Sequence, residues 1–466
     1  MSNENLLYSH TPGVEWKNGF PIGNGRIGGM LCGALDCRMA LNHEWLYRGE
    51  YTDREVRDVS PERLAELRKM IIDGKYHEAA RLGNELLAGD GGLLDYRGSP
   101  RPPRVDPYQP AGDLFIESAD DDVSDYFRRL EIDKALFSSG YTCGKKQVLR
   151  RCFASFCPDG AESGGGSICY EYSSTEPSSL RVRYSRAEDP HCVTKVTPDG
   201  NGFTVVGEFK GNSHFALRVS IRECDGEYCF RDGAIELNGV KRVVMYIGIG
   251  AGERSVDVLA EASRLPEESF DRLLEKHIAA YSERYGACNI DIDCEESRLT
   301  AGERMERVRK GESDAGLPLL WYNYAKYLLL SSSGSLPPTL QGIWNESVTP
   351  PWQCDFHFDV NIEMCYWFAE AAGLGECVGS LFEFCERMMD SAREAARRLY
   401  GCRGIVFPLQ TDAHSRATPE SYGWAVWIGA APWAGMHFWE RWEYSRDEKF
   451  LRERAYPFLK AIAEFY

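Results

Sequence analysis

The sequence has no long apolar run and no excess of positive charge, and these absences exclude several classes of protein. No apolar stretch approaches the roughly 18 residues that a membrane-spanning helix needs. Lys and Arg number 54 against 71 Asp and Glu, which gives a net charge of −17. A chain of this sign repels nucleic acid and anionic membrane surfaces, because both carry phosphate groups. We therefore expect no nucleic-acid partner and no membrane partner, whereas a neutral ligand such as a sugar is compatible with the charge.

Export signals and disulfide motifs are also missing. Residues 1–10 contain neither a basic cluster nor an apolar segment, so the sequence predicts no secretory signal. The 16 cysteines are scattered along the chain without a CxxC pair. Without export, such cysteines are expected to be reduced thiols that serve as small buried apolar residues. The sequence therefore predicts a cytoplasmic protein.

Motifs for nucleotides and metal ions are weak. The segment from Gly23 to Gly28 formally matches GxGxxG, but Pro21 and the surrounding glycines do not form a strand that leads into a helix. His357 and Asp359 offer two types of metal ligand, yet a third ligand at a suitable spacing is missing. We therefore expect no cofactor and no metal ion.

The hydrophobic pattern changes along the chain from a period of two to a helical period. Residues 21–33 are too rich in glycine for a helix and predict short strands joined by tight turns with positive φ. Ser60 and Pro61 are a good N-cap and first-turn pair for a helix. Between residue 108 and about residue 250, short alternating segments separated by turns predict an antiparallel sandwich. These segments are residues 167–172, 180–184, 203–206, 215–221 and 242–249.

Apolar stripes at helical spacing follow residue 252. One stripe consists of Leu317, Leu320, Tyr324 and Leu328, and another of Leu381, Cys385, Met388, Ala392, Ala395 and Leu399. A last helix, with Pro457 in its first turn, is expected to reach Tyr466 because no stop signal precedes it. We therefore expect the chain to be a fragment of a longer protein.

Aromatic and polar side chains are concentrated in residues 336–370, LPPTLQGIWNESVTPPWQCDFHFDVNIEMCYWFAE. If the chain is extended there, His357, Asp359 and Asn361 lie on one face, because side chains alternate along a strand. Polar groups that converge beside aromatic rings suit a sugar, since each hydroxyl needs a partner and each ring offers a stacking surface. The alternative is a polar loop under a domain interface. A helix that starts near Asn361 is expected to bury Met364, Trp367 and Phe368.

The same segment resembles the central signature of glycoside hydrolase family 95, the α-L-fucosidases. LPPTLQGIWNES resembles the Leu-Gln-Gly-Ile-Trp-Asn run of the family, and HFDVNIEMCYWFAE resembles its His-x-Asn-x-Asn segment. Other stretches resemble family landmarks in the same order, so the resemblance covers nearly the whole chain. They are FPIGNGRIGGMLCGALDCRMALNHEWLYRG, GKYHEAARL, YQPAGDLFIE and the region from TDAHSRATPES to the last helix.

The resemblance implies a mixed multidomain fold, an N-terminal β-sandwich plus a helical (α/α)6 barrel, with the barrel incomplete in this chain. The implied domains are a β-sandwich with inserted helices (1–265), a helical linker (266–316) and a partial catalytic barrel (317–466). The implied activity is hydrolysis, with inversion and without a metal, that releases terminal α-1,2-linked L-fucose from a fucosylated oligosaccharide.

Residue roles also follow from the resemblance. Asn361 and Asp359 match the paired asparagines that orient the attacking water, which makes them the implied catalytic residues. The implied substrate-binding residues are His357, Asn345, Trp344, Trp352 and Asp412. Inversion also needs a general acid and a base, whose carboxyl groups lie roughly 6.5–9.5 Å apart. By the resemblance both fall beyond Tyr466, so we expect residues 1–466 to bind sugar weakly and to lack activity.

Two departures from the family pattern bear on the substrate. Asp359 stands where better-known members carry Asn, and a carboxylate only accepts hydrogen bonds whereas an amide also donates. Residues 407–410, FPLQ, stand where the family often has a His-His-Asn run. A relative that acts on another sugar, such as an α-L-galactosidase, is therefore an alternative.

Two further alternatives remain. A phosphorylase would need a cationic pocket for phosphate, and residues 336–370 contain no Arg or Lys. A glycan-binding protein without catalysis would follow if the chain ended at Tyr466.

Overall fold

The computed structural model describes residues 5–33, 35–49, 58–87, 105–156, 166–294, 297, 299–417 and 427–466. The chain forms two compact units. The sheet unit comprises Met1–Arg48, Gln109–Ser335 and Gln341–Val348, and the helical unit comprises Gly49–Tyr108, Leu336–Leu340 and Thr349–Tyr466. These boundaries differ from the predicted ones, because residues 49–108 belong to the helical unit and the linker helices to the sheet unit. Within the described residues, no helix is both long and apolar enough to cross a membrane.

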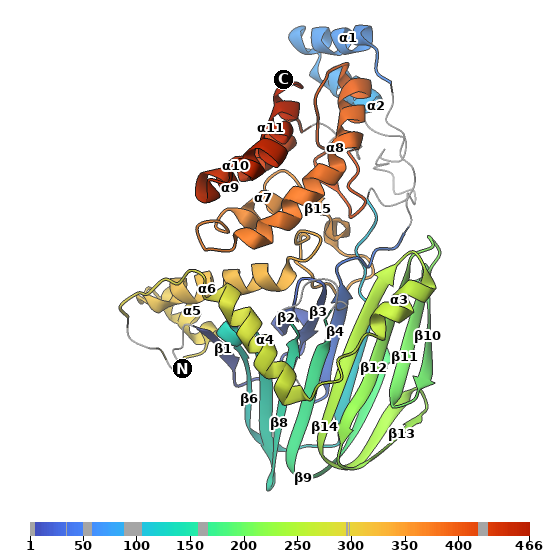
Figure 1. Cartoon of the computed structure of the whole chain (residues 1–466), viewed down its shortest axis with the longest axis vertical. Helices are drawn as coiled ribbons and strands as arrows, with labels where there is room; N and C mark the ends of the chain where they lie inside the picture. The colour runs from blue at the N-terminus through green and yellow to red at the C-terminus, as the bar shows by residue number, and fades with distance from the viewer. Residues whose placement is uncertain are drawn as a thin grey trace. The chain divides into compact units, whose positions relative to one another are not determined.

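The sheet unit is built on one sheet of fourteen antiparallel strands (Figure 1). The main path runs β1-β6-β7-β8-β9-β14-β12-β11-β10, with β13 beside β14 and a branch β5-β4-β3-β2 that starts from β9. The first strands are β1 (Leu6–Ser9), β2 (Phe20–Gly23), β3 (Ile27–Leu31), β4 (Cys37–His43), β5 (Gly112–Ser118), β6 (Val123–Glu131), β7 (Leu136–Cys143) and β8 (Lys146–Ala154). The others are β9 (Ile168–Ser185), β10 (Cys192–Asp199), β11 (Gly202–Phe209), β12 (His214–Cys224), β13 (Glu227–Arg231) and β14 (Ala234–Gly252).

The long strand β9 joins the main path of the sheet to the branch. Its first half pairs with β8 from Ile168 to Ser174, and its second half pairs with β5 from Leu180 to Ser185. Pro177 lies between the two halves, and the neighbouring strand β14 has register shifts opposite this region. Proline cannot donate to a ladder and bulges bend a strand, so both features favour a change of pairing partner here. The branch packs on β7, β8 and β9 and buries its apolar side chains there.

Helices from the linker region cover part of the outer face of this sheet. Helix α4 (Phe270–Tyr285) packs Phe270 and Leu273 on Phe153 and Tyr246 in one buried cluster. His277 of α4 is completely buried, and its Nδ1 accepts a hydrogen bond of 3.2 Å from the backbone N–H of Phe156. The other helices of the unit are α3 (Ser255–Ala262), α5 (Ala301–Arg309) and α6 (Gly316–Ser332).

Local signals in the sequence predicted many of these elements correctly. The glycine-rich residues 21–33 form the β2–β3 hairpin, and Gly25 in its turn has φ +87°. The five segments with strand periodicity lie in strands, except for Ser167, which comes directly before β9. Charged side chains obscure the period of residues 117–133, which contain all of β6. A bulge between Ser124 and Phe127 interrupts the alternation there, together with the charged side chains.

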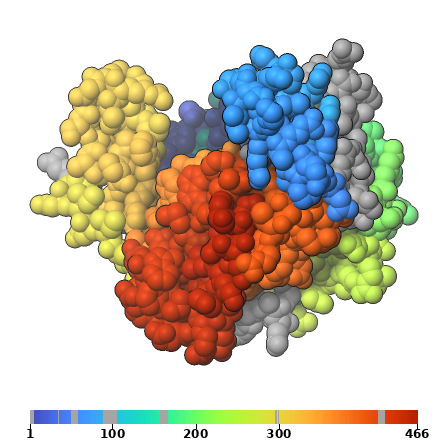
Figure 2. Space-filling view, turned by 90° about the horizontal axis from the view of Figure 1, so that it is seen from above, coloured from blue at the N-terminus to red at the C-terminus, as the bar shows by residue number. Residues whose placement is uncertain are grey.

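The helical unit contains seven α-helices and two short strands in its described part. They are α1 (Pro61–Ile72), α2 (Tyr76–Leu87), α7 (Asn361–Tyr366), α8 (Gly379–Tyr400), α9 (Ala430–Ser445) and α11 (Tyr456–Ala463), with the one-turn α10 (Glu448–Phe450) before α11, and the strands β15 (Phe356–His357) and β16 (Gln410–Thr411). The predicted N-cap is confirmed, because the Ser60 side chain accepts a hydrogen bond from Arg63 N. The α1–α2 pair adjoins α8 (Figure 2), where Val59 N donates to Arg398 O.

The two longest helices of this unit pack through apolar and aromatic side chains. The stripe of α8 predicted from Leu381 to Leu399 is buried at all six positions. Phe382 of α8 packs on Phe438 of α9, with ring centroids 4.4 Å apart, and Phe438 stacks on Phe458 of α11 at 4.2 Å. Helix α11 has Pro457 in its first turn, as predicted, but it ends at Ala463 before the last residue.

Candidate active site

The segment that carries His357 and Asn361 has an unusual backbone. Trp352, Gln353 and Cys354 have φ values of 55°, 56° and 53°, and Val360 has φ 142°. Non-glycine residues rarely adopt positive φ, and for a β-branched residue such as valine it is a genuine outlier. Such backbone strain clusters at functional sites, where the surrounding structure enforces it. The strain therefore marks residues 352–360 as a candidate functional segment.

Strand pairing fixes the position of His357. Phe356 and His357 of β15 pair with Thr411 and Gln410 of β16, and the N–H of Phe358 donates to the carbonyl of Leu409 at 2.7 Å. The strand ends there, and α7 begins at Asn361. The predicted helix start near Asn361 is confirmed. The predicted extended run is wrong beyond His357, because the chain turns at Val360.

The imidazole of His357 lies between two carboxylates. Its Nδ1 is 2.9 Å from Oδ1 of the buried Asp355, and its Nε2 is 3.8 Å from Oδ1 of Asp359. The Trp352 ring lies near the imidazole in an edge arrangement, with centroids 5.7 Å apart. A hydrogen bond from Nδ1 to Asp355 fixes the orientation of the ring and leaves Nε2 on the side of Asp359. The structure thus brings His357, Asp359 and Trp352 together.

A pocket of about 310 Å³ adjoins this group, and both His357 and Asn361 line it. Asp359 does not line the pocket, and its side chain is about one-third exposed beside His357. The lining residues are Pro338, Thr339, Leu340, Asp355, Phe356, His357, Val360, Asn361, Ile362, Met364 and Cys365. Since none of these residues is Lys or Arg, the pocket suits a neutral ligand better than a phosphate.

Glu363 is the most perturbed carboxyl group near this pocket, and it was not among the predicted site residues. Its side chain is fully buried, and neither carboxylate oxygen has a hydrogen-bond partner in the described structure. Burial is the main cause that raises the pKa of Glu363 to about 7. The backbone N–H groups of Glu363 and Val360 and the nearby His357 oppose this rise, whereas the charge of Asp359 adds to it. A buried polar group without a partner is rare in proteins and often has a functional reason. The position of Glu363 in the sequence motif could not reveal its raised pKa, because its burial depends on α8 and α9.

Helix α7 buries a different face from the predicted one. Ile362, Glu363 and Tyr366 are buried, whereas Met364 and Trp367 are 51% and 49% exposed. The prediction that Met364 and Trp367 are buried is therefore wrong. The helix is only six residues long, so neighbouring helices rather than its own apolar pattern decide which face is buried.

Asp412 is fully buried and takes part in a network of the helical unit. Its carboxylate accepts hydrogen bonds from the backbone N–H of Asp106 at 2.8 Å, from the N–H of His414 at 3.1 Å and from the Arg416 guanidinium. The neighbouring β16 pairs with β15, which carries His357. This network orders the loop after β16, and the predicted contact between Asp412 and a sugar stays a prediction.

Trp344 and Asn345 belong to the sheet unit, where both are buried. The indole N–H of Trp344 donates to Ile22 O at 2.8 Å. Asn345 accepts from Ser347 N at 2.9 Å, and its backbone N–H donates to Asn42 at 3.0 Å. These bonds give both residues a structural role next to the β2–β3 hairpin. Their predicted sugar contacts remain untested by this geometry.

Comparisons with known proteins agree with this architecture. Residues 7–254 match the N-terminal domain of glycosyl hydrolase family 65, and residues 269–466 match the catalytic domain of glycosyl hydrolase family 95. A solved structure that bears the name of a kojibiose phosphorylase, from the human microbiome, has a TM-score of 0.59 and 12% identity. The match spans 100% of this chain and 59% of the chain in that structure. This likeness concerns the fold alone.

Two curated proteins are similar along nearly the whole chain. Alpha-L-fucosidase 2 of Arabidopsis thaliana is 25% identical over 97% of this chain and 57% of its own length. Probable alpha-fucosidase A of Aspergillus niger is 26% identical over 99% of this chain and 60% of its own length. The chain therefore spans 57–60% of the length of these relatives.

Both matched regions, residues 7–254 and 269–466, are thus similar to domains of glycosyl hydrolases. More particularly, the match to the catalytic domain of glycosyl hydrolase family 95 spans residues 269–466, which include every residue that lines the pocket.

Proposed function

We propose that the pocket of the helical unit binds the fucose residue of an α-L-fucoside and that the protein hydrolyses a terminal α-1,2 linkage with inversion. The observation that carries this proposal is the group of His357, Asp359 and Asn361 at one strained segment, with His357 and Asn361 lining the same pocket. The curated relatives named as fucosidases support the choice of sugar. In this proposal, helices α8, α9 and α11 belong to an (α/α)6 barrel.

Each residue of the group has a chemical role in the proposed reaction. Inverting hydrolysis places a water molecule on the face of the sugar opposite the leaving group. The amide oxygen of Asn361 and the carboxylate of Asp359 can accept the protons of this water, which orients its lone pair toward C1. His357, held by Asp355, offers Nε2 to a sugar hydroxyl. Trp352 supplies a ring surface beside the pocket, and its indole is 46% exposed.

The expected lack of activity concerns glycosides, which need a general acid. The test therefore uses a substrate that does not depend on a general acid, and in this proposal the carboxylate of Asp359 serves as the base that accepts the proton of the attacking water. In α-L-fucosyl fluoride the C1–F bond breaks without protonation of the leaving group, while the water oxygen forms the new C1–O bond and its proton passes to Asp359 and then to solvent. Proton NMR during early turnover should show β-L-fucose first. A first product with the α configuration would overturn inversion.

Variants of the pocket assign the reaction to these residues. Asn361→Ala should lower the rate by about 10²-fold or more, in the range typical of a group that positions a reactant. Asp359→Asn restores the family residue but removes the proposed base, so it should lower the rate of fucosyl fluoride hydrolysis. Faster turnover of α-L-galactosyl fluoride than of the fucosyl substrate would instead identify the α-L-galactosidase alternative. Binding of L-fucose without turnover of either fluoride would favour a glycan-binding protein.

A further inference from the structure

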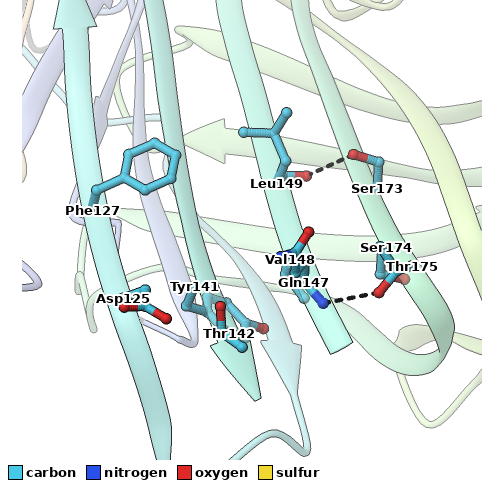
Figure 3. Close-up of a pocket in the computed structure, with 10 residues that line it drawn as sticks. All are labelled: Asp125, Phe127, Tyr141, Thr142, Gln147, Val148, Leu149, Ser173, Ser174 and Thr175. Atoms are coloured by element: carbon cyan, nitrogen blue, oxygen red, sulfur yellow. Dashed lines mark hydrogen bonds between the residues drawn. The ribbon is translucent and has the colours of Figure 1, made fainter. Parts of the chain in front are cut away.

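The sheet unit has a groove that the proposed active site does not use. It lies on the outer face of strands β6, β7, β8 and β9 and has a volume of about 590 Å³ (Figure 3). Small-molecule sites in proteins typically measure roughly 300–1,000 Å³. Helix α4 covers the other end of these strands through Leu136 and Phe153, so the groove occupies the end that α4 leaves open.

Strand register builds the floor of the groove. Phe127 of β6 pairs with Gly140 of β7, which pairs with Leu149 of β8, which in turn pairs with Ser173 of β9. Residues paired across strands share one face of a sheet, so these four form one row. A Cβ atom at Gly140 would lie 2.7 Å from the Phe127 ring. The ring therefore rests on the glycine, and the missing side chain makes the depression.

A second row adds polar groups beside the first. It contains Thr142 of β7, Gln147 of β8 and Thr175 of β9, and the N–H of Gln147 donates to Thr175 Oγ1 at 3.0 Å (Figure 3). Within the described residues, the Gln147 side-chain amide and the Thr142 hydroxyl have no hydrogen-bond partner in the protein. An amide and a hydroxyl both donate and accept, so together they match the hydroxyl groups of a sugar.

The charge of the groove indicates a neutral ligand. Asp125, at the bulge of β6, is the single charged side chain among the described residues that line it. The nearby cations have other partners. Arg151 Nε donates to Glu171 at 2.7 Å, and Lys241 Nζ donates to the carbonyl of Thr175 at 3.0 Å. Arg129 Nε donates to Ser138 at 2.9 Å, and its guanidinium lies 5.6 Å from the centroid of the Phe127 ring. A phosphate or carboxylate ligand would need a free cation, and the lining has none among the described residues.

The apolar surface of the groove is too small for a stable protein partner. Phe127 and Leu149 are its large outward-facing apolar side chains, and Leu149 is 37% exposed. A specific protein interface buries about 1,600 Å² in total, with a central apolar cluster. One ring with a flanking aliphatic side chain and several polar groups instead matches one or two sugar rings, whose C–H faces stack on aromatic surfaces.

We propose that this groove is a second glycan-binding site, which takes a short neutral oligosaccharide through stacking on Phe127 and hydrogen bonds to Gln147 and Thr142. The inference rests on the proposed function only for the choice of glycan as ligand. A second site of this kind would hold an oligosaccharide or a branched glycan on the sheet unit without taking part in hydrolysis.

The experiment measures binding of 2′-fucosyllactose by saturation-transfer-difference NMR. The protein used, called the parent variant, carries His357→Ala and Asn361→Ala, so that binding in the pocket of the helical unit is removed. The parent variant should still bind the trisaccharide. Adding Gln147→Ala should raise the Kd by about threefold to tenfold, the loss expected for one or two hydrogen bonds. Adding Phe127→Ala as well should remove measurable binding.

Matched controls separate the groove from the rest of the sheet. Tyr228→Ala removes a 41% exposed aromatic side chain of β13, outside the groove, and should leave the Kd of the parent variant unchanged. Gln147 is exposed, so its substitution is expected to leave thermal unfolding unchanged. The proposal would be overturned if the parent variant did not bind the trisaccharide. It would also be overturned if the parent variant and the variant with the additional Phe127→Ala and Gln147→Ala substitutions bound it equally well. Neither result bears on the stereochemical test with fucosyl fluoride.

Discussion

Replacing Glu363 by Gln should stabilise the protein at alkaline pH. The carboxyl group is buried near Cys385 of α8, and His437 of α9 contacts the backbone of Glu363. Neither carboxylate oxygen has a hydrogen-bond partner within the described residues. In the folded protein its pKa is about 7, whereas the ordinary value is 4.5. The unfolded chain therefore loses this proton at a lower pH than the folded protein does. As pH rises from about 4.5 to 7, the folded state loses stability, and above pH 7 the deficit is constant.

The magnitude follows from the two pKa values. Each tenfold change in the dissociation constant corresponds to about 1.4 kcal/mol, so the full effect is roughly 3 kcal/mol above pH 8 and less than about 1 kcal/mol at pH 5. Gln has nearly the same shape as protonated Glu and does not ionise. The Glu363→Gln variant should therefore unfold with a free energy close to that of the wild type at pH 4.5 and about 3 kcal/mol higher at pH 8.5.

The assay is urea unfolding followed by tryptophan fluorescence between pH 4.5 and 8.5. Glu443→Gln is the matched control, because Glu443 is an exposed carboxylate of α9, and its curve should parallel that of the wild type at every pH. If the wild type and Glu363→Gln differed by the same free energy at all pH values, the inference of a buried, uncompensated carboxyl group would be refuted.

Three other predictions concern the framework around the two candidate sites. His277→Ala should lower the free energy of unfolding by about 2–4 kcal/mol at pH 7 in thermal or urea unfolding, because it leaves buried backbone groups without partners. Burial lowers the pKa of His277 to about 4, so wild-type stability should fall as pH drops from about 6.5 to 4, and this acid dependence should shrink in the variant. Asp412→Asn should cost about 2–3 kcal/mol, since it removes the charge that faces Arg416, and an unchanged melting temperature would contradict the role assigned to that network. A reducing agent should leave the melting temperature unchanged, because the 15 cysteines in the described residues are free thiols, and a marked drop would reveal a disulfide.

Sequence patterns alone determined the local elements of this protein. The β2–β3 hairpin follows from glycines in a turn, α1 from its Ser60 cap, and the buried face of α8 from a stripe at helical spacing. Each of these depends on residues a few positions apart, so composition and period were sufficient. The family motif likewise located His357 and Asn361, because it is a contiguous stretch of sequence.

Only the tertiary structure decided the properties that depend on distant neighbours. Glu363 became a buried acid with a raised pKa because α8 and α9 enclose it, whereas Met364 and Trp367, close to it in the chain, stayed exposed. The groove on the sheet joins Phe127 to Ser173 through the register of four strands, and one bulge in β6 sets part of that register. Strand register and helix packing are set by contacts between segments far apart in the chain, and no period in one segment encodes them.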